Sequence, residues 1–160
     1  MALEIERKFL VSGDAWRTRA HKAVAMRHGY LTPLASPASV RVRVEGEIGK
    51  LNVKQATVGT SRAEYEYDIP ADEADEMIRT LCRGLILKTR HYVTVGAHLW
   101  EIDVFEGDNA GLIVAEVELG AEDEAFEPPD WLGREVTQEH RYYNNSLASR
   151  PYRDWSEDER

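Results

Sequence analysis

Charged and apolar residues alternate along many short stretches of this chain, and the alternation predicts strands with two chemically different faces. In the first stretch the charges of Glu4, Glu6 and Lys8 stand at every second position. Because successive side chains of a β-strand point to opposite sides, these three charges share one face. The opposite face carries Leu3, Ile5, Phe9 and Val11.

The same alternation recurs further along the chain with both charge signs. The other charged positions are Arg41, Arg43, Lys54, Arg62, Glu64, Glu66, Lys88, Arg90, Glu101, Asp103, Glu116 and Glu118. A strand with one solvated side shows a similar alternation, but its outer face tolerates any polar residue. Here the positions are almost all fully charged, which favours a functional face over a merely solvated one.

Alternation and turn residues together predict eight strands joined by short links, so neighbouring strands should be antiparallel. We expect them near 2–11, 26–32, 38–46, 49–57, 61–69, 86–96, 98–105 and 112–120.

Helices are predicted between some of these strands. A short one near 14–20 would begin at Ser12 or Asp14, and a longer one near 71–83 would follow Pro70 and end at Gly84. Residues 140–149 form a candidate last helix. Residues 150–160 are polar, and we expect a frayed tail there.

Strands with charges on one face and apolar residues on the other can form a stable fold if the charged faces line a closed channel. Water and ligand then satisfy the charges, and helices cover the apolar exterior. We therefore predict an α+β fold, an eight-stranded antiparallel β-barrel with helices packed outside, as a single domain over residues 1–149.

Composition narrows the function classes. The net charge of -9 argues against a nucleic-acid polymer as partner, because such partners need a basic surface. The charged face itself is nearly neutral, with eight acidic and seven basic residues among those named above. A face of this kind suits divalent cations held together with a polyanion.

No run approaches the roughly 18 apolar residues of a membrane span, and no apolar signal-like run opens the chain. The single cysteine, Cys82, excludes an intrachain disulfide and is expected to pack in a helix. We therefore expect a cytoplasmic protein without a membrane partner, either a monomer or a homodimer.

The residue types on the charged face indicate metal-assisted phosphate chemistry. Hard cations such as Mg²⁺ take oxygen ligands, which Glu4, Glu6, Glu116 and Glu118 could supply. Arginine and lysine match phosphate oxygens, and the basic row is longer than one monophosphate requires. The pattern predicts an extended polyphosphate substrate and phosphoryl transfer to water.

These residues resemble the ExExK signature of the CYTH superfamily, the triphosphate tunnel metalloenzymes. The resemblance runs from residue 2 to about 148. The matching segments are Glu4-Ile5-Glu6-Arg7-Lys8, Gly29-Tyr30-Leu31-Thr32, Val40-Arg41-Val42-Arg43, Lys88-Thr89-Arg90, Glu101-Ile102-Asp103-Val104-Phe105, Ala115-Glu116-Val117-Glu118 and Glu135-Val136-Thr137.

The resemblance implies an antiparallel eight-stranded tunnel and a role for each charged residue. Glu4, Glu6 and Glu118 would hold one or two Mg²⁺ or Mn²⁺ ions, with Glu116 and Asp103 in support. The basic residues that would bind the triphosphate are Lys8, Arg41, Arg43, Lys54, Arg62, Lys88 and Arg90. Glu64, Glu66 and Glu101 would orient those bases.

The C-terminal part departs from the family pattern. Small bacterial members often carry Asp-Lys-Arg-Tyr where this chain has Glu139-His140-Arg141-Tyr142. Either Arg141 or His140 could replace the missing lysine, and Arg141 is our candidate for a substrate-binding role.

We therefore predict a metal-dependent hydrolase of inorganic tripolyphosphate, a small polyanion without an organic group. Alternatives are an organic triphosphatase, a class IV-type adenylate cyclase, or a non-catalytic polyphosphate-binding or nucleotide-binding module. The last would need the bases but not the carboxylates. The histidines show no zinc-ligand spacing, and no serine has an evident catalytic base.

Overall fold

The computed structural model describes residues 3–160 and contains nine strands. Residues 1–2, where the first predicted strand and the predicted domain begin, lie outside the described part. The strands are β1 (Leu3–Val11), β2 (Lys22–Tyr30), β3 (Ala38–Glu45), β4 (Ile48–Gln55), β5 (Ser61–Ile69), β6 (Arg83–Val95), β7 (His98–Glu106), β8 (Ile113–Glu118) and β9 (Leu132–Glu135).

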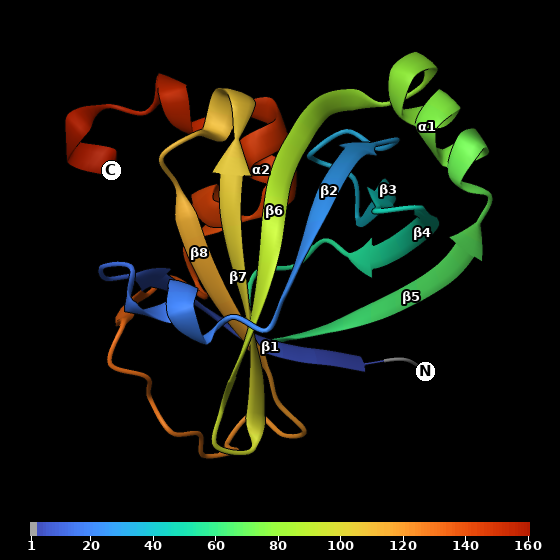
Figure 1. Ribbon diagram of the computed structural model, residues 1–160. Coiled ribbons are helices and arrows are strands. Elements are labelled where there is room, and N and C mark those ends of the chain that lie inside the picture. Colours follow the sequence, from blue (N-terminus) through green and yellow to red (C-terminus); the bar gives the residue numbers. More distant parts are fainter. Residues whose placement is uncertain (1–2) are drawn as a thin grey trace.

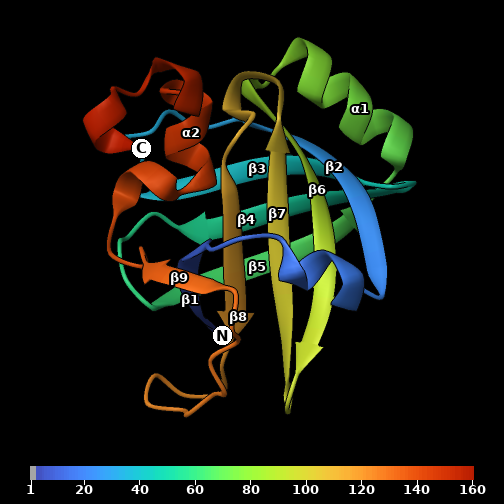
Figure 2. The same ribbon diagram turned by 60° about the vertical axis from the view of Figure 1, so that its left-hand side comes forward.

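Eight of these strands close into an antiparallel barrel, as predicted. The order is β5-β4-β3-β2-β6-β7-β8-β1, and β1 returns to β5 with Glu4 opposite Arg62. In Figure 2 the group β3–β5 runs across the group β6–β8, which shows how strongly the sheet curves before it closes. β1 thus forms the seam between the two groups, pairing with β5 and β8.

The strand predictions are confirmed, with differences at their ends. β2 begins at Lys22, four residues before its predicted start, because it pairs with β6 as far as Tyr92. β9 is a ninth strand that we did not predict, and it pairs with the outer part of β1. Its Gly133 allows this approach, since a Cβ atom there would lie 2.8 Å from the carbonyl oxygen of Leu10.

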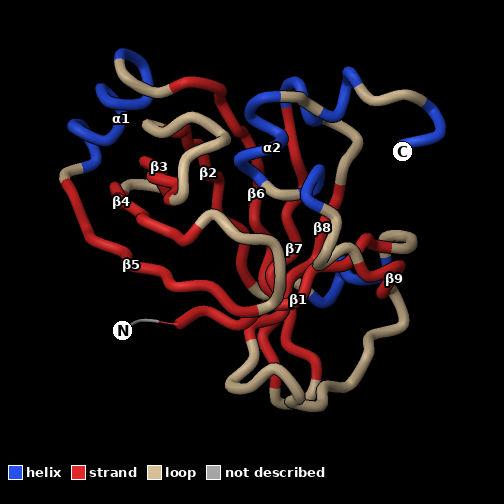
Figure 3. Tube along the Cα trace, turned by 180° about the vertical axis from the view of Figure 1, so that it is seen from behind, coloured by secondary structure: helices blue, strands red, loops and turns tan. Residues whose placement is uncertain are grey.

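The apolar faces of the strands point outward and pack against three covering segments, and the charged faces point inward, as predicted. The covers are the 3-10 helix Ala15–Arg19 with β9 and the loop before it, the C-terminal segment, and helix α1 (Ala71–Thr80). Figure 1 shows α1 and the C-terminal segment on the same end of the barrel, and Figure 3 shows long loops at the opposite end.

The two predicted helices near the N-terminus and in mid-chain are present but shorter. The first is a 3-10 helix whose fully buried Trp16 covers the barrel. α1 ends at Thr80, because the N–H groups of Leu81 and Cys82 both bond to the carbonyl of Met77 and so close the last turn. β6 then begins at Arg83, so Gly84 lies in a strand and does not end the helix.

The C-terminal region is ordered where we expected fraying. The predicted last helix is a 3-10 turn, His140–Tyr142, followed by α2 (Asn144–Ser149). The prediction of a frayed tail is wrong, because the indole of Trp155 is 4% exposed and packs edge-on against Tyr142. Burial of an aromatic ring of this size stabilises the tail by about 2 kcal/mol or more. No helix in residues 3–160 has the length and apolar character needed to cross a membrane.

Candidate active site

A cavity of about 220 Å³ occupies the interior of the barrel and collects nearly all of the predicted site residues. The predicted residues that line it are Glu4, Glu6, Lys8, Arg41, Arg43, Lys54, Arg62, Glu64, Glu66, Lys88, Arg90, Glu101, Glu116 and Glu118. Strand alternation explains the convergence, because all of these side chains stand on the inner face of their strands.

Register places carboxylates of neighbouring strands directly opposite each other. Glu6 of β1 stands opposite Glu118 of β8, and Glu101 of β7 stands opposite Glu116. Like charges in directly opposite positions destabilise a sheet. Within residues 3–160, Glu118 makes no ion pair that would offset this repulsion, so the site is short of positive charge at this point.

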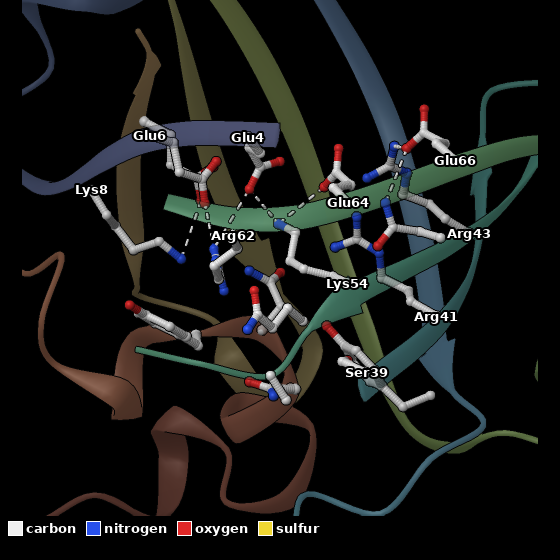
Figure 4. A pocket seen from close by; sticks show the side chains of 18 of the residues that line it. Glu4, Glu6, Lys8, Ser39, Arg41, Arg43, Lys54, Arg62, Glu64 and Glu66 are labelled. Atoms are coloured by element: carbon white, nitrogen blue, oxygen red, sulfur yellow. Dashed lines mark hydrogen bonds and ion pairs between the residues drawn. The ribbon is translucent and has the colours of Figure 1, made fainter. Parts of the chain in front are cut away.

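Glu4 and Glu6 face two cations across the cavity (Figure 4). A carboxylate oxygen of Glu4 lies 2.7 Å from Lys54 Nζ, and one of Glu6 lies 2.9 Å from a guanidinium nitrogen of Arg62. Burial, followed by the charge of Glu6, raises the pKa of Glu4 to about 8. Burial, followed by the nearby Glu116, also raises the pKa of Glu6.

The carboxylates of Glu4, Glu6 and Glu118 are chemically suited to bind a hard divalent ion. Among residues 3–160, no three carboxylate, imidazole or thiol side chains gather closely enough to form an ion site as they stand. However, burial and neighbouring carboxylates raise the pKa values of Glu4 and Glu6, and Glu6 faces Glu118, so a bound cation would favour the ionised form of these groups. Carboxylate oxygens are the ligands that Mg²⁺ and Mn²⁺ use.

A second cluster surrounds Asp103, which we had predicted as a metal ligand. One of its oxygens lies 2.7 Å from Lys88 Nζ, and Arg90 donates to both oxygens at 2.8 and 2.9 Å. Asp103 is 1% exposed and does not line the cavity. The structure therefore places it behind two basic residues and apart from Glu4, Glu6 and Glu118.

The two sides of this cluster respond differently to burial. Burial lowers the pKa of Lys88 to about 8, although Asp103 acts against that change. Burial alone would raise the pKa of Asp103, but Arg90 and Lys88 hold it at about 2. The difference arises because Asp103 has two cationic partners, whereas Lys88 shares its one carboxylate with Arg90.

Other carboxylates pair with basic residues of the cavity, among them Glu64, Glu66 and Glu101, which we predicted to orient those bases. Glu64 lies 3.2 Å from Lys54 Nζ, and Glu66 lies 3.1 Å from Arg43. Glu101 pairs with Arg90, and Glu116 lies 3.2 Å from Lys8 Nζ.

The C-terminal candidate Arg141 does not line the cavity. Its guanidinium pairs with Glu139 at 3.3 Å and stacks over the rings of Tyr142 and Trp155, outside the cavity. His140 lines the cavity instead, and its Nδ1 lies 3.2 Å from the hydroxyl of Ser146. Of the two alternatives left open by the sequence, the geometry favours His140.

Several neutral residues complete the cavity wall and were not predicted. They are Tyr30, Ser39, Asn52, Gln55, Ala56, Thr57, Tyr143, Asn144 and Asn145. The alternation itself could have identified Ser39 and Asn52, which stand two residues from Arg41 and Lys54. For Tyr143 to Asn145 no periodic signal exists, because they follow a 3-10 turn.

With this geometry in place, the sequence profile of the CYTH domain matches residues 2–152. The chain belongs to the CYTH family. Its relatives include an inorganic triphosphatase of Acetivibrio thermocellus, 46% identical over 98% of this chain and all of that protein. An inorganic triphosphatase of Nitrosomonas europaea is 39% identical over 91% of this chain and 96% of that protein.

Solved structures agree with the CYTH assignment. The crystal structure of an inorganic triphosphatase superposes with a TM-score of 0.67 at 36% identity, covering 91% of this chain and 97% of the other. A protein of Pyrococcus horikoshii, with a TM-score of 0.60 and 19% identity, covers 75% of this chain and 80% of its own, and shares the fold.

Proposed function

We propose that this CYTH domain hydrolyses inorganic tripolyphosphate to phosphate and pyrophosphate, with one or two Mg²⁺ or Mn²⁺ ions as cofactor. The observation that carries the proposal is the cavity, into which seven strands direct both carboxylates and cations. The two relatives at 46% and 39% identity, both inorganic triphosphatases, support it.

The basic residues of the tunnel would bind the polyphosphate chain. Arg41 and Arg43 of β3 offer planar guanidinium groups that suit two phosphate oxygens at once. Lys8 of β1 and Lys88 of β6, two strands that are separated by β7 and β8, offer ammonium groups. With its pKa at about 8, Lys88 is charged at pH 7 and donates hydrogen bonds to phosphate oxygens as charge develops on the leaving pyrophosphate.

Glu6 and Glu118, with Glu4 beside them, are the residues that would hold the ion. A divalent cation bound there supplies Lewis acidity toward a phosphoryl oxygen and lowers the pKa of water. When ionised, these carboxylates repel the polyanion, and a bound cation offsets that repulsion. Substrate and cation are therefore expected to bind with positive coupling.

The charged lining favours a substrate without an organic group. Among the residues around the cavity, only Tyr30, Ala56 and Tyr143 offer apolar surface. One feature favours the alternative of an organic triphosphate. A second cavity of about 300 Å³ adjoins the tunnel, shares Tyr30, Ser39, Ala56 and Asn145 with it, and is lined partly by Pro33 and Leu34.

A substrate panel distinguishes these functions. Tripolyphosphate, ATP and thiamine triphosphate are each incubated with Mg²⁺ or Mn²⁺, and phosphate, pyrophosphate and cyclic AMP are quantified. The proposal predicts that tripolyphosphate is turned over far faster than either organic triphosphate. Preferred hydrolysis of ATP or thiamine triphosphate would assign the second cavity to an organic group, and cyclic AMP with pyrophosphate would indicate a cyclase.

Two arginines provide a matched pair of variants for the same assay. Arg41→Gln removes an inward guanidinium, and the KM for tripolyphosphate should rise by about tenfold or more. Arg27→Gln removes an outer one that pairs with Asp75 at 2.5 Å, and KM should not change. Equal effects of the two variants would contradict binding inside the tunnel.

A further inference from the structure

Tyr143 lies where the C-terminal segment meets two predicted substrate-binding residues. Its ring centre is 4.9 Å from Lys8 Nζ and 5.0 Å from the guanidinium carbon of Arg62. The side chain is 5% exposed and lines the tunnel cavity. It is absent from the three apolar clusters of the exterior, so its ring serves the charged interior.

The Tyr143 hydroxyl connects two segments that are distant in sequence. It donates a hydrogen bond to the carbonyl of Thr137 at 2.5 Å and accepts one from the N–H of Gly59 at 3.2 Å. Gly59 has a φ of 140°, a backbone conformation that favours glycine, and lies in the β4–β5 loop. Ala56 and Thr57 of that loop line the tunnel.

The Thr137 end of this connection also fixes the backbone of Lys8. The Lys8 N–H donates to the Thr137 hydroxyl at 3.0 Å, and the Lys8 carbonyl accepts from the N–H of Val136 at 2.8 Å. Residues 136–143 therefore hold Lys8 at its backbone and, through the ring, at its ammonium group. A single short segment sets both the place and the direction of this side chain.

An aromatic ring positions a cation differently from a carboxylate. A carboxylate partner neutralises the cation and competes with phosphate for its hydrogen-bond donors, whereas the face of a ring attracts the cation and leaves those donors free. Lys8 pairs with Glu116, and Arg62 pairs with Glu6 at 2.9 Å and with Glu4 at 3.7 Å. Both cations share the ring of Tyr143.

We propose that Tyr143 is a positioning residue of the phosphate site. Its ring aligns Lys8 and Arg62, and its hydroxyl ties the loop over residues 56–60 to the C-terminal segment at the tunnel wall. The inference rests on the proposed function, because it takes Lys8 and Arg62 as the groups that contact the polyphosphate.

Two substitutions separate the ring from the hydroxyl. Tyr143→Phe keeps the ring and loses the tie to Gly59, so the KM for tripolyphosphate should rise several-fold while kcat stays within about twofold. Tyr143→Leu also loses the ring, and kcat should fall by about tenfold in addition. Tyr142→Phe is the control, because that hydroxyl contacts Arg134 and its ring packs on Trp155 outside the cavity.

Hydrogen exchange of the 56–60 loop gives a readout that does not depend on turnover. Exchange in this loop should be faster in Tyr143→Phe than in the native protein and in Tyr142→Phe. Inactivity of the native protein on tripolyphosphate would refute the proposed function, while loop exchange would still test the tie.

Two results would overturn the positioning role. One is a Tyr143→Leu protein that is less stable but has native kcat and KM in its folded fraction, which would make Tyr143 a packing residue only. The other is unchanged loop exchange in Tyr143→Phe, which would remove the tie through the hydroxyl.

Discussion

Replacing Lys88 with methionine should make the protein more stable and much less active. Lys88 is 1% exposed, and its ammonium group contacts Asp103 at 2.7 Å and the side-chain oxygen of Asn144 at 3.1 Å. Asp103 keeps both hydrogen bonds from Arg90 when the lysine is removed. The substitution therefore removes a buried charge without leaving its carboxylate partner unpaired.

The expected gain follows from the pKa of Lys88, which burial lowers from 10.5 to about 8. At about 1.4 kcal/mol for each pKa unit, keeping the buried ammonium charged destabilises the folded state by about 3 kcal/mol at pH 7. Loss of the hydrogen bond to Asn144 offsets about 1 kcal/mol of this. The free energy of unfolding should rise by about 2 kcal/mol in Lys88→Met.

Urea unfolding at several pH values tests this account. Because the pKa of Lys88 is lower in the folded protein than in the unfolded chain, its destabilising effect is complete below about pH 8 and disappears above pH 10.5. The gain from Lys88→Met should therefore shrink across that interval and become a loss of about 1 kcal/mol above pH 10.5, where only the lost hydrogen bond to Asn144 remains. Lys50→Met, at a more exposed position on β4, should change stability by less than about 0.5 kcal/mol.

A loss of stability in Lys88→Met at pH 7 would refute this reasoning, because the lysine charge would then stabilise the fold. A gain in stability with full activity would show that the buried charge of Lys88 is not needed for turnover. The predicted combination, higher stability with lower turnover, would show that the charge is kept for its action on the substrate.

Three further predictions concern the ion site and the tail. Glu118→Gln should lower metal-dependent phosphate release by several orders of magnitude, and stability should stay the same or rise because the substitution removes a charge that faces Glu6. A near-native rate would show that Glu118 is not a ligand of the ion. Because the pKa of Glu4 is about 8 without an ion, Mg²⁺ binding at pH 7 should release protons, and its affinity should increase as pH rises toward 8. Calorimetry in two buffers of different ionisation enthalpy measures the proton release, and binding without it would contradict a Glu4 ligand. Trp155→Ala should destabilise the protein by about 3–5 kcal/mol in urea unfolding, and a loss below about 1 kcal/mol would mean that the tail adds little, as in the exposed control Arg153→Ala.

The barrel could be predicted from the sequence because its strands carry an unusually regular signal. Charges such as Arg41 and Arg43, two residues apart, specify which face is inward, and the same rule held on the barrel strands that line the cavity. The four-residue β9 has no such alternation. It forms because Gly133 allows close contact with Leu10, a tertiary condition that no local pattern records.

The sequence predicted which residues face inward but not how far along the barrel axis each of them lies. Glu101 and Asp103 are alternate residues of one strand with the same inward direction, yet one lines the cavity and the other lies behind Lys88. Alternation gives the face of a strand and does not give the distance along the barrel axis. The choice between His140 and Arg141 likewise depended on the orientation of a 3-10 turn.

The C-terminal segment contributes to the site in a way that required the folded structure. Tyr143 reaches Lys8 across a sequence separation of more than 130 residues, and its neighbour Tyr142 faces Trp155 on the outside. Two adjacent tyrosines thus have opposite environments, which composition and spacing alone could not distinguish.

A crystal structure of the protein with Mn²⁺ and diimidotriphosphate, a tripolyphosphate analogue with NH in place of both bridging oxygens, tests the tunnel site most directly. We expect an anomalous manganese peak within coordination distance of Glu6 and Glu118, and the analogue along Lys8, Arg41 and Lys88 inside the barrel. An analogue bound to the outer surface, or manganese bound away from these carboxylates, would contradict the tunnel site.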